Sequence, residues 1–266
     1  MSITITGSKM MPPDLTQKIF FHGVPDSPVI WSPVLDALGL DSNTVSTPGL
    51  PGFQSPQPEG FGGSKDDYAN WAASIVRDKF EAKGPVDIVG HDWGALIVHR
   101  VSMLVPEMIR SWTIASAVIS PNYNGHRTAR MWNTPLVGEA LMAITSGKTV
   151  EKGLIKAGVP EVIASEEAQH WRKRHMRRSI LGLYRSANGL RFQNDWCKEL
   201  DKSPSTGMLI WGEHDPYVPA SVAQGFAKSH GYPIKVIPET GHFVLAEKPN
   251  AFANTLSNFW NSLGDD

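Results

Sequence analysis

The sequence predicts an α/β fold, with a mostly parallel central sheet flanked by helices and interrupted by a helical insertion. Short apolar runs alternate with segments of helical period up to about residue 120, and the alternation resumes after Pro204. Between 121 and 203 the helical period dominates and strand candidates are few. Alternating strands and helices are typical of βαβ units, whose strands run parallel. We therefore expect one core domain, formed by 1–120 and 204–266, and a helical insertion at 121–203.

The elements of the first half are predicted from apolar runs that end in turn residues. The helix that follows the Gly- and Pro-rich stretch has apolar residues at helical spacing, with Ser64 or Asp66 at its start and Gly84-Pro85 at its end. The apolar run at 95–104 directly follows a turn and is predicted as a helix. The shorter apolar runs are predicted as strands. The predicted strands are 18–22, 86–89 and 111–116, and the predicted helices are 66–80 and 95–104.

The second half begins with the insertion and ends with two further strand–helix pairs. A positive cluster lies within the insertion at 172–178, where it forms either the solvated face of a helix or a steering surface for an anionic substrate. The predicted strands are 208–211 and 234–237, and the predicted helices are 219–229 and 249–262.

Composition excludes several classes of protein. The 266 residues are 41% hydrophobic and 19% charged, which is typical of a globular chain and not of a disordered one. A net charge of −1 argues against a nucleic-acid partner. Cys197 is the only cysteine, so no intrachain disulfide can form, as expected for a cytoplasmic protein. No signal peptide and no apolar run of about 20 residues is present, so no membrane partner is expected.

A pentapeptide between an apolar strand and an apolar helix carries the first chemical signal. Gly90-His91-Asp92-Trp93-Gly94 has glycines where a sharp strand–turn–helix bend needs them, and this bend exposes its central residue at the end of the sheet. A nucleophile elbow usually has serine there, whereas this chain has Asp92. The alternative is an ordinary turn whose aspartate caps the helix.

Two later residues make the elbow interpretation stronger. Asp215 follows one predicted strand and His242 follows the next, so both lie at the carboxyl ends of strands, where the ligands of open parallel sheets gather. The chain order of nucleophile, acid and histidine is that of α/β hydrolases. The strand at 111–116 is followed by no carboxylate, so Asp215 is the better candidate for the acid.

The chain resembles the epoxide hydrolase and haloalkane dehalogenase branch of the α/β-hydrolase fold over nearly its full length. His22-Gly23-Val24-Pro25 is similar to the HGxP motif of that family, and Pro51-Gly52-Phe53-Gln54-Ser55 resembles its Gly-x-x-Ser loop. The family usually has two strands before HGxP, whereas only 2–6 could form one here. The resemblance implies that 121–203 is the cap (lid) of the family.

The resemblance also implies roles for the site residues. Asp92 matches the nucleophile that forms a covalent alkyl ester, His242 the base that activates water, and Asp215 the acid that orients this base. The backbone amides of Val24 and Trp93 match the oxyanion hole. His22, Trp93 and Tyr123 are expected at the substrate.

The sequence contains features of both possible reactions, epoxide opening and halide release. Epoxide opening needs O–H donors on the ring oxygen, and Tyr184 resembles the second of two cap tyrosines with this role; Tyr123 is a weak candidate for the first. Halide release needs N–H donors, and Trp93 matches one of them. Val24 cannot supply the side-chain donor that many dehalogenases have at its position, although a cap tryptophan (Trp132, Trp171 or Trp196) could replace it.

The leading hypothesis is an epoxide hydrolase acting on a small or medium apolar organic substrate. A haloalkane dehalogenase is the closest alternative, and a ligand-binding homologue without turnover is an alternative of another class. A serine esterase is disfavoured, since no serine occupies the elbow. No metal cluster, dinucleotide fingerprint or P-loop is present, so neither a metal nor a cofactor is expected. A monomer and a homodimer both remain open.

Overall fold

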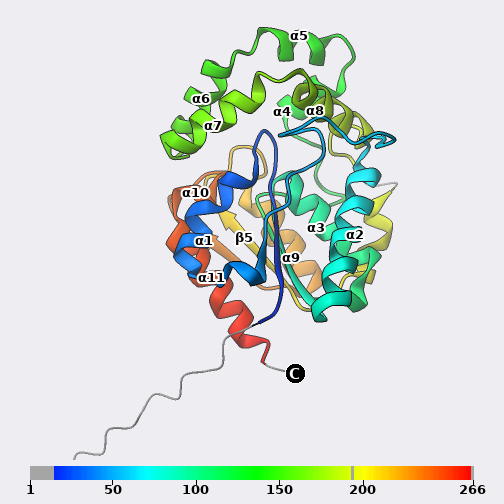
Figure 1. Cartoon of the computed structure of the whole chain (residues 1–266), viewed down its shortest axis with the longest axis vertical. Helices are drawn as coiled ribbons and strands as arrows, with labels where there is room; N and C mark the ends of the chain where they lie inside the picture. Colours follow the sequence, from blue (N-terminus) through cyan, green and yellow to red (C-terminus); the bar gives the residue numbers. More distant parts are fainter. Residues whose placement is uncertain (1–14, 193–194, 265–266) are drawn as a thin grey trace, which may run out of the picture.

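The computed structural model describes residues 15–192 and 195–264, and its centre in these ranges is a six-stranded sheet (Figure 1). The strand order is β2-β1-β3-β4-β5-β6, and every neighbouring pair is parallel. The strands are β1 Lys18–Phe21, β2 Val45–Ser46, β3 Val86–His91, β4 Ile109–Ala115, β5 Gly207–Gly212 and β6 Ile234–Ile237.

The central strands are apolar on both faces because helices cover both sides of the sheet. Ile19 and Phe21 pack with the α2 and α3 side chains, whereas Phe20 lies between them in sequence and packs with those of α1 and α11. Successive side chains of a strand point to opposite faces, so a strand buried on both sides reads as a continuous apolar run.

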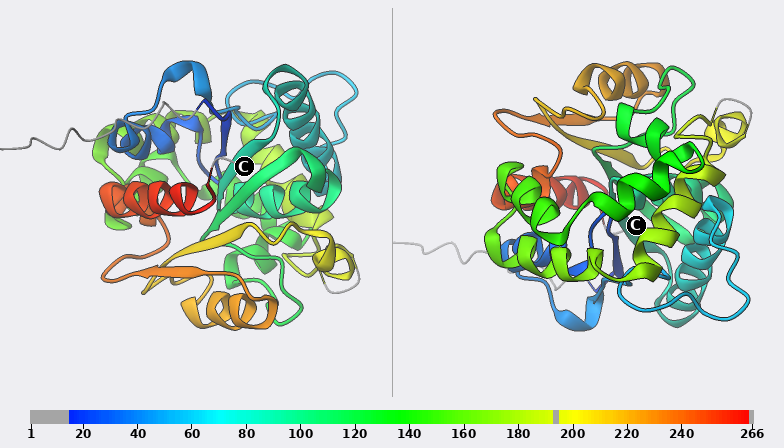
Figure 2. Two further views of the ribbon diagram at one scale, coloured as in Figure 1. Left: turned by 90° about the horizontal axis from the view of Figure 1, so that it is seen from below. Right: turned by 90° about the horizontal axis from the view of Figure 1, so that it is seen from above.

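Two helical layers cover the faces of the sheet (Figure 2). One layer holds α2, α3 and α9, and the other holds α1, α10 and α11. Ser64 starts α2 with a capping box that it shares with Asp67. The helices of the two layers are α1 Ser32–Leu38, α2 Lys65–Lys83, α3 Trp93–Leu104, α9 Ala220–His230, α10 Val244–Glu247 and α11 Pro249–Ser262.

The remaining helices form a group over the carboxyl ends of the strands (Figures 1 and 2). This group is joined to the layers below it through α8, which packs on α2, and through the contact of α7 with the loop after β1. Its helices are α4 Arg127–Asn133, α5 Val137–Ile144, α6 Gly147–Lys156, α7 Glu161–Trp171 and α8 Arg174–Ser186.

The predicted fold class is confirmed, and the sheet is parallel throughout its described strands. Helix α1 and strand β2 were not predicted, because their segments are short and rich in turn residues. Helix α3 begins at Trp93, two residues before the predicted start, so Asp92 directly precedes a helix. The strand predicted at 2–6 lies outside the described residues. Within them, no helix combines the length and the apolar character needed to cross a bilayer.

Candidate active site

Asp92 occupies the turn between β3 and α3 in a backbone conformation that residues other than glycine rarely adopt. Its φ is 52° and its ψ is −121°. A Cβ on Gly90 would lie 2.2 Å from the carbonyl oxygen of Gly94, and one on Gly94 would lie 2.0 Å from that of Phe21. Only glycine fits at both positions, so the pentapeptide forms the sharp bend expected of a nucleophile elbow.

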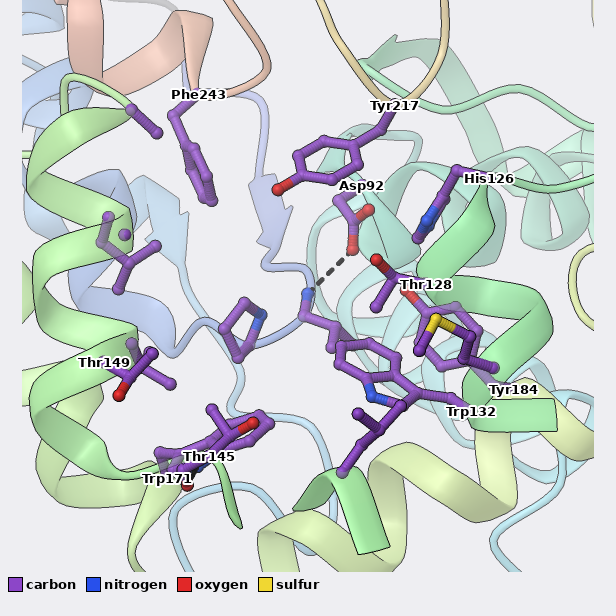
Figure 3. Close-up of a pocket in the computed structure, with 18 residues that line it drawn as sticks. Asp92, His126, Thr128, Trp132, Thr145, Thr149, Trp171, Tyr184, Tyr217 and Phe243 are labelled. Atoms are coloured by element: carbon purple, nitrogen blue, oxygen red, sulfur yellow. Dashed lines mark hydrogen bonds between the residues drawn. The ribbon is translucent and has the colours of Figure 1, made fainter. Parts of the chain in front are cut away.

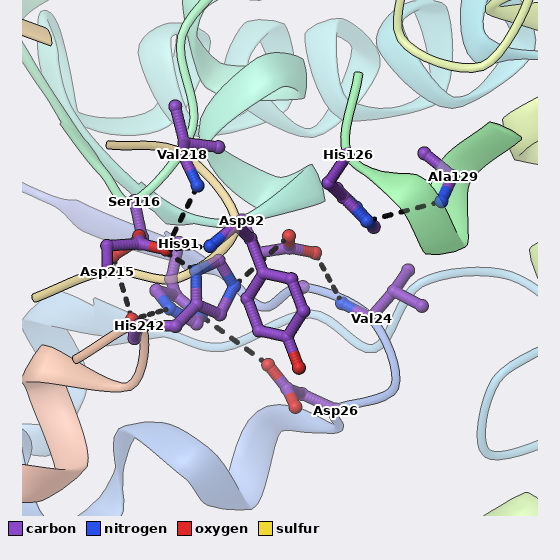
Figure 4. Close-up of polar contacts among 12 residues, drawn as sticks. Val24, Asp26, His91, Asp92, Ser116, His126, Ala129, Asp215, Val218 and His242 are labelled. Carbon is purple, nitrogen blue, oxygen red and sulfur yellow. Dashed lines mark hydrogen bonds and ion pairs between the residues drawn. The ribbon is translucent and has the colours of Figure 1, made fainter. Parts of the chain in front are cut away.

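The structure brings Asp92, His242 and Asp215 together (Figure 4). His242 Nε2 lies 3.3 Å from Asp92 Oδ2, and Nδ1 lies 2.9 Å from Asp215 Oδ2. The other oxygen of Asp215 accepts the amide N–H groups of Tyr217 at 2.8 Å and Val218 at 3.0 Å. Asp215 is therefore held in place, and it orients the imidazole toward Asp92.

Two carboxylates control the charge of His242. Burial by itself would lower the pKa of His242, but Asp215 and Asp92 hold this pKa well above its usual range. Burial would raise the pKa of Asp92, but the hydrogen bond and the charge of His242, with help from the Val24 amide, hold it below its usual range. Asp92 is therefore ionised at neutral pH.

The predicted oxyanion donors differ in what they contact. The amide of Val24 donates to Asp92 Oδ1 at 2.8 Å. A Cβ at the preceding Gly23 would lie 2.5 Å from that of Asp92, so glycine is needed for this close approach. Among the described residues no hydrogen bond joins the Trp93 amide to Asp92, although this amide is at the free N-terminus of α3.

His22 does not lie at the cavity, contrary to the expectation that it contacts substrate. It is fully buried, its Nε2 accepts the amide N–H of Leu50 at 3.0 Å, and its Nδ1 donates to the Gly23 carbonyl at 3.0 Å. Burial lowers the pKa of His22 to about 4, so the ring is neutral. Both nitrogens are occupied by backbone groups, and the ring joins two loops.

A second buried histidine holds the backbone of His242. His91 Nε2 and Ser116 Oγ both donate to the His242 carbonyl, at 2.9 and 2.8 Å. His91 Nδ1 lies 3.4 Å from Asp26 Oδ2, and both side chains are fully buried. Sequence reasoning missed this pair, and the only signals were the places of His91 beside Asp92 and Asp26 beside the HGxP motif.

A cavity of about 480 Å³ opens between Asp92 and the α4–α8 group (Figure 3). Its wall is mostly apolar, with Tyr184, Tyr217, His126 and the threonines of the α4–α8 group as the polar exceptions. Tyr184 is buried, and its ring lies 5.3 Å from that of Trp93 and 4.9 Å from that of Trp132. Burial and the charge of Asp92 raise the pKa of Tyr184 well above its usual range, so its hydroxyl keeps its proton.

Tyr123 lies near the site, but its hydroxyl proton is engaged. It lines a second, small space of about 10 Å³ beside Asp92, together with Trp93. Its hydroxyl donates to the Tyr217 carbonyl at 3.0 Å. Tyr217, which sequence reasoning missed, places its ring 4.8 Å from that of His242.

The structure also distinguishes among the tryptophans considered as halide donors. Trp132 and Trp171 line the cavity, whereas Trp196 lies elsewhere and donates to Asp66 at 2.8 Å. The indole N–H of Trp171 donates to the Thr145 carbonyl at 2.8 Å. The indole N–H of Trp93 is buried, and it interacts with the Tyr184 hydroxyl without forming a well-aligned hydrogen bond. Trp93 and Trp132 therefore remain as candidate donors.

The fold and the elbow define an α/β hydrolase. The profile of the alpha/beta hydrolase family matches residues 19–255, which is most of the chain. The chain therefore belongs to the alpha/beta hydrolase family. No curated protein sequence is a significant match to it.

Solved structures with the same fold have different activities. A haloalkane dehalogenase from Bradyrhizobium elkani is 17% identical, with a TM-score of 0.74 over 95% of this chain and 92% of its own. An epoxide hydrolase from Vigna radiata is 18% identical, with a TM-score of 0.73 over 93% and 91%. A thermophilic esterase from Thermogutta terrifontis is 16% identical, with a TM-score of 0.74 over 94% and 91%. At these identities the similarity shows the fold alone.

Proposed function

We propose that this protein opens an epoxide to a vicinal diol through a covalent ester on Asp92. The observation that carries the proposal is the ionised carboxylate of Asp92 at the elbow, 3.3 Å from a histidine that a second carboxylate orients. A carboxylate attacks sp³ carbon without first losing a proton, whereas a serine nucleophile must be deprotonated.

In the first step, an oxygen of Asp92 forms a bond to a ring carbon of the epoxide. The carbon–oxygen bond of the ring breaks, and its electron pair stays on the epoxide oxygen. Tyr184 supplies a proton or a hydrogen bond to this oxygen, since its neutral hydroxyl lines the same cavity.

In the second step, His242 removes a proton from water, and the water oxygen attacks the carbonyl carbon of the ester. Negative charge then develops on the former Asp92 Oδ1, which faces the Val24 amide. The bond from the carbonyl carbon to the alkyl oxygen then breaks, this oxygen takes the proton from His242, and the diol leaves as the carboxylate of Asp92 re-forms. Asp215 stabilises the imidazolium of His242 during this step.

Residues 121–203 act as a cap in this proposal and determine which substrates reach Asp92. The cavity wall that they supply is largely apolar, so we propose a small or medium apolar substrate.

Trapping of the ester tests the mechanism. The variant His242→Gln should be alkylated by an accepted epoxide and then accumulate the ester, because the base acts only in the second step. Intact-protein mass spectrometry should show one adduct, and peptide mapping should place it on Asp92. The double variant Asp92→Ala/His242→Gln is the control and should show none. An accepted substrate that leaves no adduct on His242→Gln would contradict the covalent mechanism.

A haloalkane dehalogenase is the second candidate, favoured by the buried indole N–H of Trp93 beside Asp92. Tyr184→Phe should slow alkylation by an epoxide about 10²- to 10⁴-fold and leave ester hydrolysis nearly unchanged. If halide is the leaving group, Trp93→Phe should be the damaging change and Tyr184→Phe nearly silent. Pre-steady-state kinetics with diol and halide detection separates the two reactions. A measurable single turnover excludes a homologue that only binds ligand.

A further inference from the structure

His126 lies at the start of α4 and lines the cavity together with Asp92. The proposed mechanism has so far given it no role. Its ring lines both the main cavity and the small space beside Asp92. The ring centroid lies 5.2 Å from that of Tyr217 and 6.2 Å from that of Tyr184 (Figure 3). His126 therefore lies in the same part of the cavity as the proposed proton donor.

The helix determines which nitrogen of His126 carries the proton. His126 is the N-cap of α4, and its Nδ1 accepts the amide N–H of Ala129 at 3.2 Å (Figure 4). An amide N–H can only donate, so Nδ1 presents a lone pair and the proton is on Nε2. Burial lowers the pKa of His126 to about 4, so the ring is neutral at neutral pH.

The Nε2–H group has no assigned acceptor. Among the described residues no hydrogen bond to His126 Nε2 is found, and the atom is not fully enclosed by protein. A neutral donor with a fixed tautomer, unpaired in an apolar cavity beside a nucleophile, is suited to stabilise charge that develops on a substrate.

We propose that His126 Nε2–H donates a hydrogen bond to the leaving atom and, with the Tyr184 hydroxyl, forms the leaving-group site. The proposal rests on the proposed function above, since it needs attack by Asp92. As the bond from carbon to the leaving atom breaks, its electron pair moves onto that atom, and His126 stabilises the charge while it keeps its own proton. The substrate class is then one whose leaving atom accepts two hydrogen bonds, as an epoxide oxygen does.

The variant His126→Asn separates the donor from the helix cap. Asparagine is a good N-cap residue, so it keeps the bond to the Ala129 amide, but it has no group at the position of Nε2. In the His242→Gln background, His126→Asn should slow alkylation of Asp92 about 10²- to 10³-fold, the usual effect of losing one such donor. The slowing should be larger for substrates with poorer leaving groups, because more charge develops on them. His126→Ser, a second capping variant, should behave in the same way.

Ser64→Asn is the matched control, because it exchanges one N-cap for another in α2, away from the cavity. It should leave the alkylation rate unchanged. Nitrogen NMR of the wild type should show His126 as the Nε2–H tautomer between pH 5 and 8.

The outcomes separate the two proposals. An adduct that forms at an unchanged rate in His126→Asn, or a slowing that is equal for all leaving groups, would overturn the role of His126 and leave the role of Asp92 intact. Absence of any adduct in His242→Gln alone, across epoxides and haloalkanes, would overturn the proposed function and this inference with it.

Discussion

Asp92 and His242 form an ion pair in the resting protein, and each controls the protonation of the other. The pKa of His242 is raised by Asp215 and by Asp92, so His242 carries a proton before substrate arrives. In the proposed mechanism, alkylation converts Asp92 to a neutral ester and removes one of these two charges. The pKa of His242 then falls, so the imidazolium releases its proton to solvent and the neutral ring can accept a proton from water.

The pH dependence of ester hydrolysis follows from this fall in the pKa of His242. The rate of ester hydrolysis should rise with pH and level off above the pKa of His242 in the ester, because only the neutral imidazole acts as a base. This pKa should lie below that of His242 in the free protein. Single-turnover decay of the ester and NMR titration of His242 measure the two values. A decay rate that falls as pH rises would contradict the role of His242.

At the scale of secondary-structure elements, α7 is joined to the core by a buried carboxyl group. Glu167 Oε1 accepts the backbone N–H of Ser27 at 2.8 Å and its hydroxyl at 2.9 Å. Ser27 is three residues after Val24, so this contact connects the α4–α8 group to the loop that binds Asp92. Burial and the charge of Asp26 raise the pKa of Glu167 well above its usual range.

This raised pKa predicts a pH-dependent stability. Above the pKa of Glu167 in the unfolded chain, the native state holds a proton that the unfolded state has lost, so the free energy of unfolding decreases as pH rises. The decrease ends at the pKa of the folded state and amounts to about 1.4 kcal/mol for each unit of elevation. Glu167→Gln keeps the oxygen that accepts from Ser27 and should lose this dependence.

Urea unfolding at pH 5 and pH 8 provides the measurement. Glu161→Gln is the control, because Glu161 lies in the same helix α7 and is exposed at its start. An equal pH dependence in Glu167→Gln and in the wild type would show that Glu167 is ionised in the native state.

At the scale of the whole molecule, the sheet order brings the site together from distant segments. Val24, Asp92, Asp215 and His242 follow β1, β3, β5 and β6, and all these strands end at one edge of the sheet. The α4–α8 group covers this edge and provides most of the cavity wall. We therefore expect substitutions in this group to change the size of the accepted substrate without changing the chemistry.

Gly153 offers a direct test of this expectation. It lies in α6 on the cavity wall, and a Cβ built there meets nothing within 4 Å. Gly153→Leu should narrow the cavity and lower kcat/KM for long substrates about 10-fold, while short substrates are little affected. It should also stabilise the protein by about 0.5–1 kcal/mol, because glycine is unfavourable inside a helix.

Gly225→Leu is the matched control, since Gly225 is equally unobstructed in α9 and lies outside the cavity. It should show a similar stabilisation with no change in substrate size. Substrate profiles and urea unfolding of both variants give the comparison, and an unchanged profile for Gly153→Leu would place substrates elsewhere.

The sequence by itself determined the alternation of strands and helices, the elbow at Asp92, and the places of Asp215 and His242 at strand ends. These features depend on local patterns, namely apolar runs, glycines at a bend and the order of elements along the chain. Helix α1 and strand β2 escaped prediction, because short segments rich in turn residues carry too weak a pattern.

Only the tertiary structure decided how the side chains around Asp92 are used. His22 accepts the backbone N–H of Leu50, and His91 donates to the backbone carbonyl of His242. His126 lines the cavity, and its Nδ1 accepts the amide N–H of Ala129, which fixes its tautomer. Their sequence neighbours do not distinguish these histidines. Each role depends on which backbone groups lie within hydrogen-bond distance of the two ring nitrogens, and loops far apart in the chain largely determine this by packing at one edge of the sheet.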